Sequence, residues 1–172
     1  KKKIHKFIFS INKKKIDHKN VNIIRLNLID KKKLINRLKK IKLDLIIHCA
    51  GYTNVEGCEK DFRRSYKQNF ITTKNLVEFC KLKKKRLIYI SSDHIFDGKN
   101  KFYKETSVTK GLNNYAKHKI LSEKYITNNL SDYLIVRTNF VGNSLGIKDT
   151  FNETIKKKLA HGIEINLWNN IY

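Results

Sequence analysis

The sequence predicts an α/β protein with a parallel sheet covered by helices on both faces. Short apolar runs alternate along the chain with longer stretches of helical periodicity, which is the pattern of consecutive βαβ units. Runs such as "DLIIHCA" (44–50) are almost continuously apolar, as in strands that are buried on both sides. With 172 residues, the chain has the length of one ordinary domain and can bury a substantial core.

The individual elements follow from these patterns. Runs rich in β-branched and aromatic residues predict strands at 6–10, 22–26, 44–50, 86–92 and 133–138. Apolar residues at helical spacing predict helices at 30–41, 61–82, 114–129 and 151–162, and a further strand is expected to begin at 163. Asp30 is the expected N-cap of the first helix, and Gly162 closes the last one.

The composition is strongly basic, with 38 Lys and Arg against 15 Asp and Glu and a formal net charge of +23. A basic balance raises nucleic acid, anionic lipid or anionic substrates as partners. The lysines are scattered among many Asn and Ile with no Pro, which is the drift that A+T-rich coding DNA produces. Because no zinc-finger, RNP or basic-zipper pattern accompanies them, we expect no nucleic-acid partner, with a nucleic-acid surface as the alternative.

Other function classes are excluded by what the sequence lacks. No apolar run approaches the length that spans a bilayer, and the one near the N-terminus is too short for a signal peptide. We therefore expect a cytoplasmic protein with no membrane partner. Three cysteines without CxxC spacing indicate reduced thiols, and six histidines without an HxxxH pair predict no metal.

Three polar residues in the second half of the chain point to chemistry. Tyr115 and Lys119 are four positions apart in a predicted helix and therefore share one face of it. Lysine is so abundant here that such a pair also arises by chance. Ser92, however, ends a predicted strand, and ligands of open α/β sheets bind at the carboxyl ends of strands. The three residues together form a group suited to acid catalysis.

Five ordered segments extend this group to a family resemblance. They are "DLIIHCAGYTNVEGCEKD" (44–61), "ISSDHIFDG" (90–98), "FYKE" (102–105), "LNNYAKHKILSE" (112–123) and "LIVRTNFVG" (134–142). In these segments the sequence resembles the extended short-chain dehydrogenase/reductase superfamily, and within it the dTDP-4-dehydrorhamnose reductase branch of sugar-nucleotide enzymes. The resemblance implies a Rossmann-like fold and an NADP or NAD cofactor.

The activity that the resemblance implies is reduction of the 4-keto group of a dTDP-linked deoxysugar, in dTDP-rhamnose biosynthesis. Tyr115 would be the general acid, Lys119 would lower the pKa of its phenol and hold the nicotinamide ribose, and Ser92 would orient the substrate carbonyl. No acidic residue follows the strand at 6–10 to bind a ribose 2′-hydroxyl, which favours NADP.

Two other functions stay open at this point. One is a non-catalytic regulatory or scaffolding member of the same superfamily. The other is a different extended short-chain sugar-nucleotide dehydrogenase or epimerase. For the full-length protein, a homodimer is considered.

The resemblance also assigns binding residues. For the cofactor it implies Asn27, Leu28, Cys49, Ala50, Gly51, Tyr52, Asn69, Tyr115 and Lys119. For the nucleotide-sugar substrate it implies Ser92, Asp93, Arg137, Thr138, Asn139 and Phe140. Asn27 departs from the Asp that the family commonly has there. An ion-paired strand position is the alternative for Arg137, and simple packing is the alternative for Asn69.

A further departure concerns the start of the chain. The family's glycine-rich turn, G-x-x-G-x-x-G, occurs nowhere in the sequence, and the strand at 6–10 corresponds to the family's second strand. We therefore expect a fold without its first βα unit, in which 1–142 form a partial NAD(P)-binding domain and 143–172 begin a substrate-binding region. The absence of Met also indicates a fragment, which alone is expected to be inactive and poorly stable.

Overall fold

A computed structural model describes residues 6–12, 22–139 and 149–165. Its strands are β1 (Ile8–Ile11), β2 (Asn22–Arg25), β3 (Leu45–His48), β4 (Arg86–Ile90) and β5 (Tyr133–Val136). Its helices are α1 (Lys31–Leu38), α2 (Val55–Lys60), α3 (Phe62–Ser65), α4 (Thr72–Lys83), α5 (Asn114–Asn129) and α6 (Phe151–Ala160), with a π-helix η1 (Tyr66–Ile71) and a 3₁₀ turn η2 (Asp93–Ile95). None of these helices is long and apolar enough to cross a membrane.

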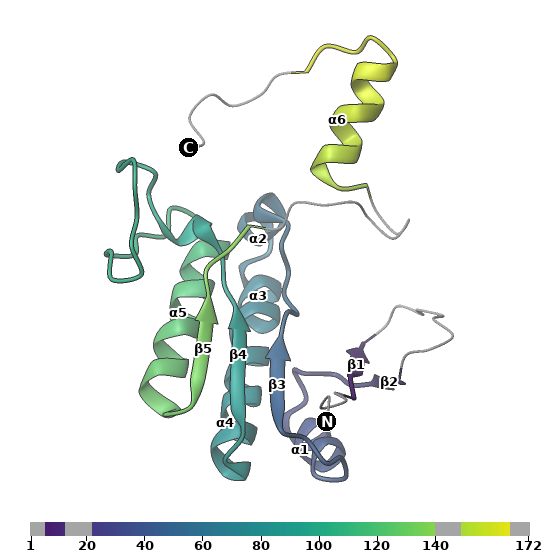
Figure 1. Cartoon of the computed structure of the whole chain (residues 1–172), viewed down its shortest axis with the longest axis vertical. Helices are drawn as coiled ribbons and strands as arrows, with labels where there is room; N and C mark the ends of the chain where they lie inside the picture. Colours follow the sequence, from purple (N-terminus) through teal and green to yellow (C-terminus); the bar gives the residue numbers. More distant parts are fainter. Residues whose placement is uncertain (1–5, 13–21, 140–148, 166–172) are drawn as a thin grey trace, which may run out of the picture.

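All five strands are parallel to their neighbours, as predicted, but they form two sheets. One sheet pairs β1 with β2, and the other has the order β3-β4-β5. Figure 1 shows the three-stranded sheet with β1 and β2 set apart on the side of β3. The break between β1 and β3 falls where a doubly wound sheet has its central first strand. It therefore coincides with the unit that the sequence predicted to be missing.

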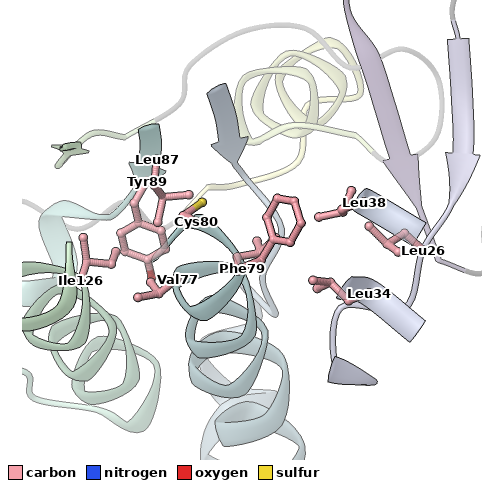
Figure 2. Packing of buried hydrophobic residues seen from close by; sticks show 10 residues of the cluster. Leu26, Leu34, Leu38, Val77, Phe79, Cys80, Leu87, Tyr89 and Ile126 are labelled. Carbon is pink, nitrogen blue, oxygen red and sulfur yellow. The ribbon is translucent and has the colours of Figure 1, made fainter. Parts of the chain in front are cut away.

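Helix α4 connects the two sheets through one hydrophobic core. Phe79 points toward Leu34 and Leu38 of α1 and Leu26 beside β2, as Figure 2 shows. Other buried side chains of α4 face β4 and α5. Among them, Val77 and Cys80 pack with Leu87, Tyr89 and Ile126. In addition, the side-chain amide of Asn75 donates to the carbonyls of Leu28 and Ile29, at 2.9 and 3.0 Å.

The two faces of the three-stranded sheet differ in their cover. Helices α4 and α5 pack against the face that carries Leu87 and Tyr89, both buried. On the opposite face, Ile47 is paired in register with Ile88 and then Leu134, and both Ile47 and Leu134 are exposed. The α/β class is confirmed, while the predicted helical cover is present on one face among the described residues.

The helix predicted at 61–82 is one continuous run with an internal change of geometry. A π-helical segment separates α3 from α4. Thr73 donates from its hydroxyl to the carbonyl of Asn69, and Ser122 of α5 donates to the same oxygen, at 2.9 and 3.0 Å. Such π-bulges are rare and occur mostly at functional sites. Here the bulge lies at Asn69, a predicted cofactor residue.

Three other sequence predictions lie wholly or partly outside the described residues. The domain boundary at 142 falls between residues 140 and 148, which are not described. The strand expected from 163 cannot be followed, because the described chain ends at 165, and 163–165 contain no strand. Residues 13–21 follow the strand at 6–10, where the lack of an acidic residue favoured NADP, and they are also outside the described ranges.

The difference between the sheet faces predicts that two substitutions lower the free energy of unfolding by unequal amounts. Leu87→Ala removes a side chain that is 0% exposed, and should lower the free energy of unfolding by about 2–5 kcal/mol. Leu134→Ala, at a residue 45% exposed, should cost less than about 1 kcal/mol. Urea titrations followed by circular dichroism measure both. An equal loss in the two variants would mean that the Leu134 face is covered in solution.

Candidate active site

The predicted site residues gather at one edge of the three-stranded sheet. Because β3, β4 and β5 are parallel, their carboxyl ends lie together, at the upper ends of the arrows in Figure 1. The segments that leave this edge are 49–52 after β3, 91–93 after β4 and 137–139 after β5. These segments contain most of the positions that the resemblance assigned.

Ser92 and Tyr115 meet above the end of β4. Ser92 begins η2, where its hydroxyl accepts from the backbone N–H of His94 at 3.2 Å. Tyr115 is buried in the first turn of α5, with its ring edge-on to that of His94, 5.9 Å between centroids. Burial raises the pKa of Tyr115 above its ordinary value, a hydrogen bond with Ser92 opposes this rise, and Asp93 adds to it. The phenol is therefore protonated at neutral pH.

Lys119 is close to this pair, although its charge is directed elsewhere. Its Nζ donates to the carbonyl of Ile90 at 2.6 Å and lies 4.1 Å from the centre of the Tyr89 ring. Burial lowers the pKa of Lys119 to about 8, while Glu123 and Cys49 act to raise it. The sequence predicted that Lys119 lowers the pKa of Tyr115. In the structure burial is the largest influence on Tyr115 and the ammonium is turned toward β4, so this effect of Lys119 stays a prediction.

The start of α5 fixes the position of Tyr115. Asn113 is the N-cap, and its side chain accepts from the N–H of Ala116 at 2.8 Å. The carboxylate of Glu59 in α2 accepts from both the backbone and the side chain of Asn114, which also suits the positive end of the helix dipole. Gly111 allows the preceding loop to approach, since a Cβ there would lie 2.8 Å from the backbone nitrogen of Lys117.

The loop after β3 is held by the side-chain amide of Asn69. The Oδ1 atom accepts from the N–H of Tyr52 at 2.7 Å, and Nδ2 donates to the Tyr52 carbonyl at 3.1 Å. A Cβ on Gly51 would lie 3.0 Å from the same Oδ1, so a larger residue there would crowd the contact. Asn69 thus acts on the loop backbone from within η1.

A cavity of about 190 Å³ opens at the carboxyl ends of β1, β2 and β3. Its lining includes four predicted cofactor residues, Asn27, Leu28, Ala50 and Gly51, together with Ser10, Ile11, Asn12, Leu26, Ile29, Gln68 and Thr72. It lies beside the break between the sheets, which is where ligands of doubly wound folds bind. Its lining combines apolar side chains, side-chain amides and small residues, so the site fits part of a dinucleotide.

The segment after β5 uses its arginine within the protein. Arg137 donates to the carboxylate of Glu123 from Nη2 at 2.8 Å, and from Nη1 to the carbonyl of Glu105, also at 2.8 Å. Thr138 donates from its hydroxyl to the carbonyl of Asn139 at 3.2 Å. Phe140 lies outside the described residues. Arg137 is therefore ion-paired within the protein at the end of β5. Its contact with substrate stays a prediction.

Several residues that shape the site are not among those that the sequence predicted. Glu123 is buried and contacts both Arg137 and Ser91. Glu123 is four residues after Lys119 on the same predicted helix, and this spacing could have identified it as a neighbour of Lys119. Glu59 carried no comparable signal, because its partner Asn114 is 55 residues away in sequence. Across the described residues, no three His, Cys, Asp or Glu side chains are grouped to hold a metal ion.

The parallel strands and the cavity at their carboxyl ends define a Rossmann-like α/β protein. Comparison with known families narrows this class. The family described as RmlD substrate binding domain matches residues 7–170, and the chain belongs to it.

Individual relatives agree with the family. The chain is 28% identical over 150 residues to a probable low-salt glycan biosynthesis reductase of Haloferax volcanii, covering 84% of the chain and 49% of the relative. It is 31% identical over 103 residues to a dTDP-4-dehydrorhamnose reductase of Mycobacterium tuberculosis, covering 57% and 34%. It is also 30% identical over 112 residues to methionine adenosyltransferase 2 subunit beta of Xenopus laevis, covering 65% and 34%.

Among solved structures, the dTDP-4-dehydrorhamnose reductase of Bacillus anthracis in complex with NADP has a TM-score of 0.75 and 26% identity. The match covers 83% of this chain and 51% of that one. The chain therefore spans about half the length, or less, of the relatives that it matches.

A buried histidine beside the site predicts acid sensitivity. His48 is 2% exposed and hydrogen-bonded to Thr73, and burial lowers its pKa to about 3 from an ordinary 6.5. Below pH 6.5 the unfolded chain takes up a proton that the folded chain does not. The free energy of unfolding should therefore decrease as the pH is lowered below 6.5, and His48 should contribute about 1.4 kcal/mol per pH unit to this decrease.

Urea midpoints of the wild type and His48→Gln between pH 6.5 and 5 test this expectation. In the variant, stability should depend much less on pH. Part of the dependence should remain, because burial also lowers the pKa of His118. The same slope in both proteins would show that His48 does not limit stability in acid.

Proposed function

We propose that the protein reduces the 4-keto group of a nucleotide-linked deoxysugar with NADPH or NADH, and that Tyr115 is the acid. The observation that carries this proposal is the Ser92–Tyr115 pair beside Lys119, at the edge of the sheet where the dinucleotide-type cavity opens. The relatives named dTDP-4-dehydrorhamnose reductase and the NADP-bound structure support the substrate and cofactor class.

The chain's own residues account for the proton side of such a reaction. When bound, the nicotinamide supplies hydride to the carbonyl carbon, which leaves negative charge on the carbonyl oxygen. The ordinary pKa of a tyrosine is 10 and burial raises that of Tyr115 further, so at physiological pH its phenol holds a proton to deliver to that oxygen. Ser92 is within hydrogen-bonding reach of the phenol and would orient the same oxygen.

Lys119 has two roles in this proposal. Its ammonium, one helical turn from Tyr115 on α5, would stabilise the phenolate that Tyr115 becomes. One of its three N–H donors is used at the Ile90 carbonyl, and another would hold a ribose hydroxyl of the cofactor. With a pKa lowered to about 8, Lys119 is mostly charged at neutral pH.

The binding assignments follow the positions on the sheet edge. Asn27, Leu28, Ala50 and Gly51 would hold the cofactor at the cavity, with Cys49, Tyr52 and Asn69 forming and supporting the adjoining loop. Asp93, Thr138, Asn139 and Phe140 are proposed substrate contacts. The division into an NAD(P)-binding part up to 142 and a substrate-binding part after it belongs to the proposal, as do the dTDP-rhamnose pathway, a cytoplasmic location and a homodimer.

A regulatory role is the second candidate. It is favoured by the similarity to methionine adenosyltransferase 2 subunit beta, which is named as a subunit. A regulatory member would bind NADPH without oxidising it when keto-sugar nucleotides are supplied. Titration of NADPH fluorescence, followed by an absorbance assay with dTDP-4-keto-6-deoxyhexose, separates the two functions.

Tyr115→Phe tests the proposed acid in the protein expressed from the complete gene. Removing the phenolic proton should lower kcat by about 10²- to 10⁴-fold and leave NADPH affinity unchanged. Tyr133→Phe, at the opposite end of the sheet in β5, is the control and should keep wild-type turnover. If Tyr115→Phe retains full activity, Tyr115 is not the acid.

A further inference from the structure

We propose that Glu123 and Arg137 are a positioning pair, which holds together four segments at the reacting end, among them the helix that carries Lys119. The inference deepens the proposed function and rests on it for the role of Lys119. Neither residue is assigned to the reacting atoms. Both act through the groups that they contact.

The first observation is the set of partners around the Glu123 carboxylate. Glu123 is 5% exposed, and its Oε1 accepts from the hydroxyl of Ser91 at 2.5 Å. The guanidinium of Arg137 donates from Nη2 to Oε2 at 2.8 Å and from Nε to both oxygens at 3.3 Å. This buried carboxylate thus joins α5 to the ends of β4 and β5. A buried charge is tolerated only with such partners.

The second observation is what else Arg137 touches. From Nη1 it donates to the carbonyl of Glu105, and its guanidinium lies 5.4 Å from the centre of the Phe96 ring. Both partners belong to the long connection between η2 and α5, the segment that follows Ser92. Three of the five guanidinium donors are thereby used within the protein. Arg137 therefore anchors this connection to the helix that carries Tyr115 and Lys119.

The third observation is the electrostatic setting of Lys119. Glu123 lies one helical turn beyond it on α5 and acts to raise its pKa against the effect of burial. Cys49 after β3 acts in the same direction, while the Ile90 carbonyl and the Tyr89 ring face the ammonium from β4. Glu123 is the acidic residue nearest in sequence on the same helix face, so it favours the charged form of Lys119.

Two conservative variants test the pair without using catalysis. Glu123→Gln keeps the shape of the side chain and removes its charge, and Arg137→Lys keeps the charge and loses the planar fork. The matched control is Arg86→Lys, because Arg86 pairs with Asp132 at the other end of β4, where both side chains are at least half exposed. Two readouts are used: trypsin cleavage at Lys99, Lys101 and Lys104, and the NMR titration of ¹⁵N-labelled Lys119, assigned with Lys119→Arg.

Both pair variants should be cleaved in this connection about tenfold faster or more than wild type, while Arg86→Lys is cleaved at the wild-type rate. Glu123→Gln should also lower the pKa of Lys119, because the carboxylate that favours its charged form is lost. Wild-type cleavage rates in both variants would overturn the proposal. If Glu123→Gln does not fold, Arg137→Lys decides the cleavage test alone.

Kinetics of the protein from the complete gene separate this inference from two alternatives. A positioning role lowers kcat in both variants, whereas a direct substrate contact by Arg137 would raise only KM in Arg137→Lys and leave cleavage unchanged. That second pattern would overturn the proposal. If the wild type has no reductase activity but cleavage and titration behave as expected, the proposed function fails while the positioning pair stands.

Discussion

The burial of α4 on two sides is the interaction on which the rest of the structure depends. β1 and β3 are not hydrogen-bonded to each other, so the two sheets share no ladder at the break. Phe79 packs toward α1 and β2, and Val77 packs toward β4 and α5 (Figure 2). The amide of Asn75 adds hydrogen bonds to the β2–α1 connection. Without this helix, the cavity between the sheets would have no fixed walls.

The candidate site is positioned by buried polar side chains that act on backbone or on each other. Asn69 holds the loop after β3, and Glu59 holds the start of α5. Glu123 connects the ends of β4 and β5 through Ser91 and Arg137. Each of these groups would be costly if left unpaired in the interior, so the contacts define one arrangement of the loops.

Burial also determines the electrostatics of the proposed catalytic group. It raises the pKa of Tyr115 against the effect of the Ser92 hydrogen bond, and it lowers the pKa of Lys119 against the effects of Glu123 and Cys49. The two shifts leave the phenol of Tyr115 with a higher pKa than the ammonium of Lys119, which reverses their ordinary order. A protein with a net charge of +23 thus has a site whose protonation is governed by its interior rather than by its surface lysines.

The sequence by itself determined the element order, the parallel strands and the positions of Ser92, Tyr115 and Lys119, because apolar periodicity and motif order are local properties of the chain. It also indicated the gap in the sheet through the missing glycine turn. The tertiary structure decided where Lys119 points, that Arg137 pairs with Glu123, and which sheet face is covered. These features depend on contacts between residues distant in the chain, such as Glu59 and Asn114, and on burial, which no local pattern encodes.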